Sequence, residues 1–289
     1  MNIKLFFLTF LNGLTLAALY FLVASGFTLV FGLMRNVNLA HGSLYLLGGY
    51  IGWSVADATG SWMVGLLVAF LAMAVAGILM QTLIFRWMQG QDLRQTMVTI
   101  GLSIVLADLM LWIWGGEFYQ FTPPAWLFGA ASIPFAGFKY PILRLAILAA
   151  AIVIGVALWI FLNRTAIGMM IRAGVDDQDM LDASGVNVNV VFAVVFAVGA
   201  GLAGFAGVIG GTIQSLAPGE DVHYLLASLV VVIVGGMGSV TGAAVGAVLV
   251  GLAEQFGLTY TPTYGVIYTF LIMVLVLAFR PQGIMGAAR

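Results

Sequence analysis

The sequence predicts an all-α, polytopic integral membrane protein with eight or nine transmembrane helices, and three observations predict that class. The 289 residues are 63% hydrophobic and only 7% charged, whereas soluble domains carry about 25% charged residues. Apolar runs of ~20 residues, each long enough to cross ~30 Å of hydrocarbon as a helix, recur from one end of the chain to the other. One long polar interruption, residues 163–189, separates two of these runs. We therefore expect a single transmembrane domain over residues 1–289, with segment 163–189 outside the bilayer.

Nine apolar runs follow one another along the chain, at residues 5–33, 39–55, 62–85, 97–114, 142–162, 190–213, 224–234, 240–256 and 264–279. The first is much longer than the ~7–15-residue apolar core of a signal peptide, so we expect it to remain as a span, tilted or broken near Gly13 or Gly26. The short run 224–234 precedes a glycine-rich tetrapeptide, which indicates a half-helix or a re-entrant turn buried in protein. Four prolines predict an irregular extramembrane loop over 116–140.

The distribution of cationic residues predicts the orientation, because Lys and Arg favour cytoplasmic loops. Alternating the spans places three cations on one side, Lys4, Lys139 and Arg144. The other side receives Arg35, Arg86, Arg94, Arg164, Arg172, Arg280 and Arg289. We therefore expect segment 163–189 and the C-terminus to face the cytoplasm, and loops 116–140 and 214–222 to face outward. With nine crossings the N-terminus lies outside, and with eight it lies inside.

Segment 163–189 is the longest polar stretch, and it holds six of the chain's charged residues: Arg164, Arg172, Asp176, Asp177, Asp179 and Asp182. Acids in the first turn of a short helix complement its dipole, and Gly185 would end that helix as a C-cap residue. Connections between helices are usually ~2–8 residues long, and this one is about three times longer. We interpret it as a coupling helix that docks on a nucleotide-hydrolysing partner. The alternative is an ordinary solvated connector with acidic decoration.

Candidate pathway residues lie in two of the spans. Asn38 and His41 are three positions apart, hence on one helix face, at the expected cytoplasmic entrance of the second span. Alternatively, Asn38 caps the following helix and His41 satisfies a neighbouring backbone group. Thr99 and Ser103 either line a polar path or bond to carbonyls of their own preceding turn. Asp108 is an intramembrane acid, a candidate for proton relay or cation coordination.

Two further features concern buried packing. Glu254 lies near the outer end of its run, and we expect it to meet water or a polar partner at an interface. Glycines repeat at three- and four-residue spacing in two runs, which predicts close helix–helix contacts or, more specifically, a dimer seam or moving interface. The residues expected at these contacts are Gly201, Gly204, Gly235, Gly236 and Gly238.

Several classes of chemistry find no support in the sequence. There is no cysteine, no GxxxxGK[ST] phosphate loop and no paired-Asp or Ser–His constellation, and His41 has no Cys, Asp or Glu at ligand spacing. We therefore expect no catalytic residues, no metal site and no nucleotide hydrolysis by this chain itself. The net charge of −1 gives no indication of a nucleic-acid partner.

Motifs along nearly the whole chain resemble the LivH/LivM-type permeases, the membrane subunits of ABC importers for branched-chain amino acids and related substrates. The order of the motifs, and the lack of a large extra C-terminal domain, look closer to the LivH half. The residues that carry the resemblance are Gly32-Leu33, Asn38-Leu39-Ala40-His41-Gly42, Gly48, Tyr50, Arg172-Ala173, Ala183, Gly185-Val186-Asn187, the small-residue run 199–207, Gly235-Gly236-Met237-Gly238-Ser239, Gly242, Arg280-Pro281-Gln282-Gly283-Ile284 and Gly286.

The resemblance implies a bacterial or archaeal inner-membrane location and a complex of several subunits. Its partners would be a second homologous permease, two cytoplasmic ATP-binding subunits that hold the ATP and Mg²⁺, a periplasmic solute-binding protein and the lipid bilayer. The cofactor expectation for this chain is therefore none. The coupling residues implied within segment 163–189 are Arg172, Ala173, Asp176, Asp177, Asp182, Ala183 and Gly185. The acidic group at 176–179 is denser than expected for the family and would tune pairing with one ATPase.

Two other functions compete with the importer. In an ion-coupled secondary amino-acid carrier, Asp108 would be the coupling group, although the sequence lacks the array of acids at helical spacing that such a carrier usually needs. A passive channel would conduct without any energy source. The resemblance does not identify the substrate, since similar permeases handle branched-chain or polar amino acids, amides, urea or aromatic acids.

Overall fold

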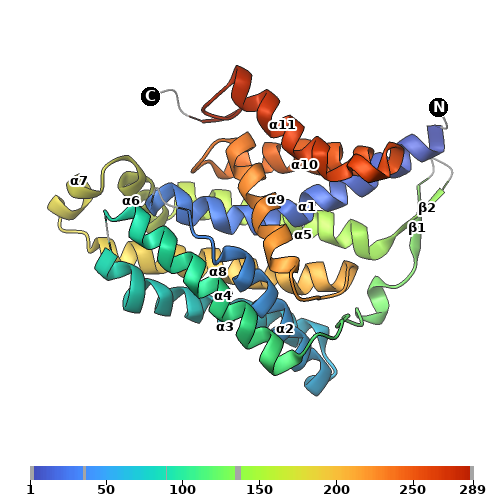
Figure 1. The fold of residues 1–289 in the computed structure, drawn as a ribbon, viewed down its shortest axis with the longest axis horizontal. Helices are drawn as coiled ribbons and strands as arrows, with labels where there is room; N and C mark the ends of the chain where they lie inside the picture. Colours follow the sequence, from blue (N-terminus) through green and yellow to red (C-terminus); the bar gives the residue numbers. More distant parts are fainter. Residues whose placement is uncertain (1–2, 35–36, 89, 134–137, 287–289) are drawn as a thin grey trace.

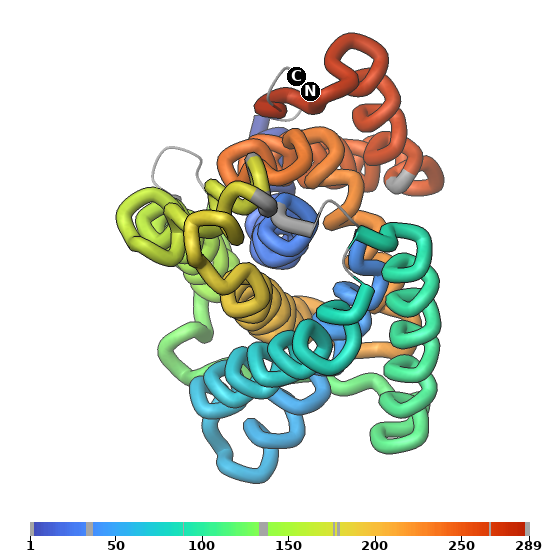
Figure 2. Tube along the Cα trace, turned by 90° about the vertical axis from the view of Figure 1, so that its left-hand side faces the viewer, coloured from blue at the N-terminus to red at the C-terminus, as the bar shows by residue number. Residues whose placement is uncertain are grey.

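The central element of the fold is α1 (Ile3–Met34), which runs through the middle of the helix bundle in the computed structural model (Figures 1 and 2). The structure describes residues 3–34, 37–88, 90–133 and 138–286. Within α1, 83% of the most apolar window is buried, against helices α5, α6, α8, α9 and α10. A helix that is apolar on all sides is expected inside a bundle rather than at its surface.

The remaining elements surround this helix in chain order. Their bounds are α2 (His41–Thr59), α3 (Trp62–Leu79), η1 (Met80–Ile84), η2 (Phe85–Met88), α4 (Asp92–Trp114), η3 (Ala125–Leu127), β1 (Ala130–Ile133), β2 (Phe138–Pro141), α5 (Ile142–Arg164), α6 (Ala166–Asp176), α7 (Gln178–Ala183), α8 (Val188–Ile213), α9 (Glu220–Gly235), α10 (Val240–Tyr260), η4 (Pro262–Tyr264) and α11 (Gly265–Phe279).

The predicted class is confirmed: every one of the nine apolar runs lies in a helix, and among the described residues six helices are long and apolar enough to cross a membrane. These six are α1, α3 with η1 and η2, α4, α5, α8 and α10. Helices α2, α9 and α11 are more polar or shorter. The 16-residue α9 matches the half-helix predicted around 224–234, and it crosses its neighbours steeply in Figure 1.

Two expectations about local structure were wrong. First, the break offered as one alternative near Gly13 or Gly26 is absent, because α1 is one continuous helix. A Cβ added at Gly26 would collide with the carbonyl group of Gly199 in α8, so this glycine permits a close helix contact instead of a break. Second, segment 116–140 is not irregular throughout, because β1 and β2 pair antiparallel with Ala131 opposite Tyr140.

The bundle has two ends, which we call the α6–α7 end and the hairpin end (Figure 1). Helix α1 begins at the hairpin end, where β1 and β2 lie, and finishes beside α6. This is the direction expected if nine segments cross the membrane alternately. Arg86 in η2, Arg94 in the first turn of α4 and Arg164 at the end of α5 lie at the α6–α7 end, whereas Lys4 and Lys139 lie at the hairpin end. Arg35 and Arg289, from the predicted cytoplasmic group, fall outside the described residues.

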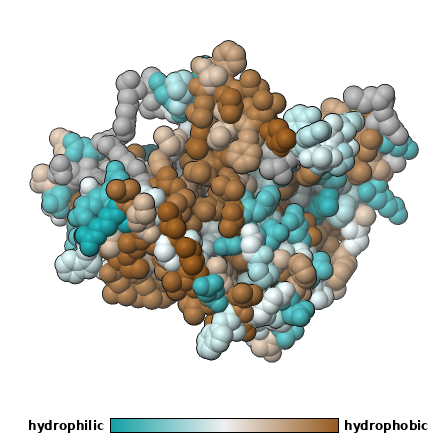
Figure 3. All heavy atoms as spheres, in the orientation of Figure 1, coloured by the Kyte–Doolittle hydropathy of each residue, from teal (hydrophilic) through white to brown (hydrophobic). Residues whose placement is uncertain are grey.

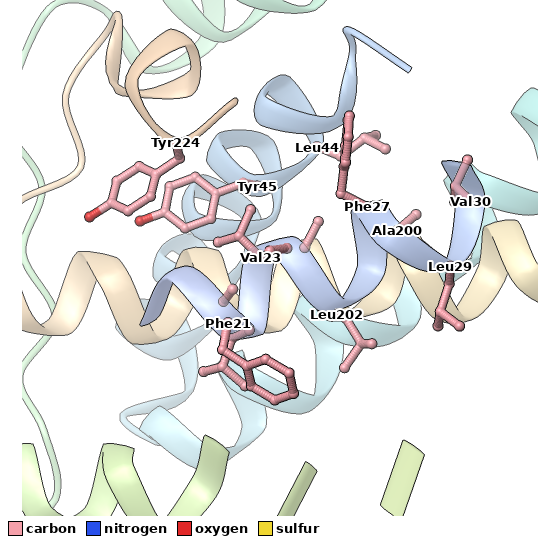
Figure 4. Packing of buried hydrophobic residues seen from close by; sticks show 14 of the residues in the cluster. Phe21, Val23, Phe27, Leu29, Val30, Leu44, Tyr45, Ala200, Leu202 and Tyr224 are labelled. Atoms are coloured by element: carbon pink, nitrogen blue, oxygen red, sulfur yellow. The ribbon is translucent and has the colours of Figure 1, made fainter. Parts of the chain in front are cut away.

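The polarity of the surface also varies between the middle of the bundle and its two ends. Hydrophobic side chains gather over the middle of the face in Figure 3, and hydrophilic ones lie toward its left and right ends. Only 11% of the most apolar window of α4 and 17% of that of α5 are buried, so both helices present apolar faces outward. The interior, shown in part in Figure 4, includes side chains of α1, α2 and α8 such as Phe27, Leu44 and Leu202.

Candidate functional site

The segment between α5 and α8 folds into two short helices, each with its own cap. The Thr165 hydroxyl accepts a hydrogen bond from the backbone N–H of Gly168 (3.0 Å) and caps α6. Asp177 Oδ1 accepts from the N–H of Met180 (3.0 Å) and caps α7. Gly185 follows α7 with φ +82°, and its N–H donates to the carbonyl of Asp182 (2.9 Å). The predicted short helix with start and stop signals is therefore present, with α6 as an additional helix before it.

Helix α6 is held tightly against the spanning helices. A Cβ added at Gly168 would come within 2.6 Å of Leu162 Cα at the end of α5, so α6 folds back directly on that helix. Ile171 in α6 and Leu181 in α7 are 3% and 7% exposed. Helix α6 contacts α1, α5 and α8, and α7 contacts α8. A displacement of α6 is therefore transmitted to three spanning helices.

The outer face of this segment carries both polar and apolar side chains. Arg172 donates from its guanidinium group to Asn163 Oδ1. The predicted coupling residues Ala173, Asp182 and Ala183 are exposed, as is Gly185. The side chains of Asp176 and Asp179 lie outside the described parts. Three apolar side chains also point away from the bundle, Ile167 (42% exposed), Met169 (55%) and Met180 (70%).

A second polar cluster lies around the start of α2, and it joins residues from several segments. Asn38 Oδ1 accepts from the N–H of Ala40 (3.1 Å), and His41 donates from Nε2 to the carbonyl of Val23 in α1 (3.1 Å). The N–H of Leu39 donates to Thr99 Oγ1 of α4 (3.2 Å). These bonds match the interpretation of Asn38 and His41 as groups that satisfy nearby backbone.

The expected position of this pair at the cytoplasmic entrance was wrong. Val23 lies well inside α1, and Asn38 and His41 are 5% and 0% exposed, so α2 begins in the interior of the bundle. Asn38 Nδ2 and His41 Nδ1 are buried without a hydrogen-bond partner. An unpaired buried polar group costs about 1–3 kcal/mol, so the start of α2 is less stable than its packing alone would make it.

The three candidate pathway residues on α4 have different environments. Thr99 and Ser103 donate from their hydroxyls to the carbonyls of Thr96 and Ile100 (2.8 Å each), which is the bonding to their own preceding turn. Asp108 is exposed at the surface of the bundle. It lines a cavity of about 130 Å³ together with Tyr50 and Asp221.

Asp221 is a site residue that the sequence reasoning missed. It lies in the first turn of α9, is 7% exposed, and accepts a hydrogen bond from Ser43 of α2 (3.2 Å). Its position within segment 214–222, which the sequence predicts to be an outward-facing loop, made it look extramembrane. The signal that could have found it is the pair of acids, Glu220 and Asp221, in the first turn of a short apolar run, where they complement the helix dipole.

Glu254 is buried inside the bundle, and the polar partner expected for it is present. The residue is 6% exposed, and its carboxylate accepts from the Tyr20 hydroxyl of α1 and from the Thr269 hydroxyl of α11 (2.9 Å each). Both oxygens are therefore paired, which is the condition for keeping an acid inside a membrane protein.

The rings of Tyr45 and Tyr224 lie side by side with centroids 4.2 Å apart (Figure 4).

The glycines predicted to pack helices have two kinds of environment. A Cβ on Gly201 would meet Phe70, and one on Gly204 would lie 2.7 Å from the carbonyl oxygen of Ala69, so both allow α8 to approach α3 closely. Gly235 faces α10, where a Cβ would lie 2.8 Å from the N of Ala243. The helical interpretation was wrong for Gly236 and Gly238, which have φ +109° and +82° in the turn between α9 and α10.

No three His, Asp or Glu side chains in the described parts of the chain lie close enough together to hold a metal ion.

Comparisons with known proteins bear on the whole chain. The model of the family described as "Branched-chain amino acid transport system / permease component" matches residues 9–277. The chain is 30% identical to the high-affinity branched-chain amino acid transport system permease protein BraD of Pseudomonas aeruginosa, over 95% of this chain and 94% of that protein. It is 28% identical to the permease protein LivH of Escherichia coli over the same shares. With the LivM protein of Escherichia coli it shares 26% identity, over 95% of this chain and 69% of that protein.

One solved structure has a related fold. It is PsaBC from Streptococcus pneumoniae in complex with Fab, with a TM-score of 0.50, 12% sequence identity, and coverage of 94% of this chain and 91% of that chain. At that identity the likeness concerns the fold alone.

Proposed function

The chain belongs to the family of branched-chain amino acid transport system permease components, and on that basis we propose that it is the translocation subunit of an ATP-driven importer. The substrates are branched-chain amino acids or related small amphipathic solutes, the class named for its relatives BraD and LivH. The sequence has no GxxxxGK[ST] phosphate loop, so in this proposal the energy of ATP comes from partner subunits.

The observation that carries the proposal is the packing of α6 and α7. The two helices contact α1, α5 and α8 on one side and leave Ile167, Met169 and Met180 uncovered on the other. Exposed apolar side chains rimmed by polar residues are typical of a protein–protein contact. A soluble ATP-binding subunit seated on this face would move α6, and α6 would move the start of α8 and the end of α1.

The partners follow from this assignment. Two ATP-binding subunits dock at the α6–α7 end and hold the ATP and Mg²⁺, and a solute-binding protein delivers substrate at the hairpin end. A second homologous permease completes the membrane core, as the coexistence of LivH and LivM permeases among the relatives supports. The α6–α7 end, with Arg86, Arg94, Arg164 and Arg172, faces the cytoplasm of the inner membrane.

The test compares one residue type at the two ends of the bundle. Met180 is 70% exposed on α7, and Met63 is 53% exposed at the start of α3. Met180→Gln is expected to weaken co-purification of the ATP-binding subunit and to lower substrate-stimulated ATP hydrolysis in reconstituted vesicles. Met63→Gln, the matched control, leaves both unchanged.

Loss of an apolar contact of this size weakens binding by roughly 1–3 kcal/mol when the side chain is central to an interface. Equal ATPase stimulation and equal co-purification for the two variants would remove the docking role of α7. Uptake that persists with ATP depleted but collapses with an uncoupler would instead support the ion-coupled carrier.

A further inference from the structure

Gln81 is a buried polar side chain without a partner. It lies in η1, a single π-helical turn between α3 and η2 in the span that these three elements form. The residue is 1% exposed, and neither Nε2 nor Oε1 has a hydrogen-bond partner. Buried amides are nearly always hydrogen-bonded, and π turns inside helices occur frequently at functional sites. Such a side chain indicates a ligand that is bound in the membrane.

Gln81 lines a cavity of about 400 Å³ between the end of the third span and the start of α8, which we call the α3–α8 groove. One end of the groove is apolar, with Ile78, Val194 and Val198. The other end is polar, with Arg86 and Asn187, and none of the lining residues is acidic. The N-terminus of the 26-residue α8 adds its positive dipole end to the polar part.

The polar and apolar parts are ordered along both helices in the same direction. From Ile78 to Arg86 a helical rise of ~1.5 Å per residue gives roughly 12 Å, and from Val198 to Asn187 it gives roughly 16 Å. Half of a ~30 Å hydrocarbon core is about 15 Å, so the groove spans one leaflet. Trp87 is 71% exposed, and the centroid of its ring lies 5.6 Å from Arg86 Cζ. It marks the headgroup level, where Trp side chains concentrate.

We propose that the α3–α8 groove binds an anionic phospholipid of the leaflet at the α6–α7 end. The headgroup phosphate pairs with Arg86, the Gln81 amide donates to a headgroup or ester oxygen, and one acyl chain lies along Ile78, Val194 and Val198. Basic pockets between helices on the cytoplasmic side are suited to anionic headgroups, because the phosphate meets a cation while the chains stay in hydrocarbon. The groove includes the first turn of α8, the next helix along the chain after α7. Lipid binding at this site is independent of whether α6 and α7 couple the permease to ATP hydrolysis.

The test uses the whole permease complex purified in detergent and stripped of lipid, then titrated with phosphatidylglycerol or with phosphatidylcholine carrying the same chains. Native mass spectrometry counts the bound lipids. We expect phosphatidylglycerol to bind in preference, and Arg86→Gln to weaken it about fivefold, the effect of one cation near the headgroup. Arg94→Gln is the matched control, since Arg94 lies at the same end, outside the groove, and bonds to Gln91. The Arg94→Gln complex is expected to bind phosphatidylglycerol with the wild-type affinity.

A second variant separates binding from packing. Gln81→Leu keeps the approximate size of the side chain and removes its unpaired amide, so the lipid-free complex is expected to melt at the same temperature or higher, while the rise in melting temperature caused by phosphatidylglycerol shrinks. A Gln81→Leu complex that binds and responds to phosphatidylglycerol like the wild type would overturn the assignment. So would equal binding of the two lipids, or equal losses in the Arg86→Gln and Arg94→Gln complexes.

The remaining occupant to test is a protein segment. Because the sequence has no cysteine, Val194→Cys places a single thiol in the groove. A heterobifunctional crosslinker, thiol-reactive at one end and photoactivatable at the other, is attached to this thiol in native membranes and is expected to yield no adduct with another subunit. A covalent adduct with the second permease or with an ATP-binding subunit would show that a protein covers the groove, and would overturn the lipid assignment.

Discussion

Gly207→Ala in α8 is the sharpest test of how this bundle is held together. Gly207 is buried against α2, and a Cβ at this position would lie closer than 3.0 Å to the carbonyl oxygen of Tyr45 and 2.8 Å from the backbone N of Gly49. Both neighbours are backbone atoms, so no side chain can rotate away. Accommodating one methyl group therefore requires the two helices to separate by about 1 Å, and close-packed interiors resist such shifts.

The control is Gly101→Ala in α4, where an added Cβ meets nothing within 4 Å. Both substitutions exchange Gly for Ala inside a helix, which by itself is favourable by ~0.5–1 kcal/mol. Overpacking costs typically ~1–3 kcal/mol, so the sign should differ between the two sites. We expect Gly207→Ala to lower the melting temperature of the purified permease by roughly 5 °C and Gly101→Ala to leave it unchanged or slightly raised.

The assay is thermal unfolding in detergent, followed by intrinsic tryptophan fluorescence at matched protein and detergent concentrations. Each variant is compared with the wild type under the same conditions, so the absolute scale of membrane-protein melting temperatures does not enter the comparison. If Gly207→Ala melts at or above the wild-type temperature, or if Gly101→Ala is the more damaging change, then close contact between α2 and α8 is not what stabilises the bundle.

Three further substitutions are expected to have distinct outcomes. Gly185→Ala forces a β-carbon into a left-handed conformation with φ +82°, at about 1–2 kcal/mol, and should reduce ATPase stimulation while the protein still inserts and binds lipid; normal coupling would contradict a fixed end to α7. Thr269→Val leaves one oxygen of the buried Glu254 carboxylate unpaired, so the melting temperature should fall by an amount equivalent to about 1–3 kcal/mol, whereas Thr269→Ser should retain it. Asp108→Asn should leave ATP-driven uptake in vesicles largely intact, because the residue is exposed and an importer driven by ATP needs no titrating acid there; abolished uptake would favour the ion-coupled carrier.

The sequence by itself determined the class of the protein, the positions of its apolar helices and its long polar segment between α5 and α8. Hydropathy is a sum over neighbouring residues, so runs such as 142–162 and 190–213 identify helices without any knowledge of their partners. Caps are equally local: Asp177 and Gly185 act on backbone groups within three residues, which is why the start and end of α7 could be predicted from the chain.

The tertiary structure decided where polar groups stand. Asp221 looked like part of a loop and is buried beside Ser43, and Asn38 and His41 looked like an entrance and lie inside the bundle. Tyr20, which pairs with Glu254, is 234 residues away from it.

The physical reason is the range of the interactions. Insertion of an apolar run depends on its own residues, but whether a buried carboxylate, amide or imidazole is satisfied depends on the atoms across the helix interface. Those atoms come from distant segments, and no local pattern records them. Gln81 shows the consequence, since nothing beside it in the sequence distinguishes an amide that is buried without a hydrogen-bond partner from one that is hydrogen-bonded inside the protein.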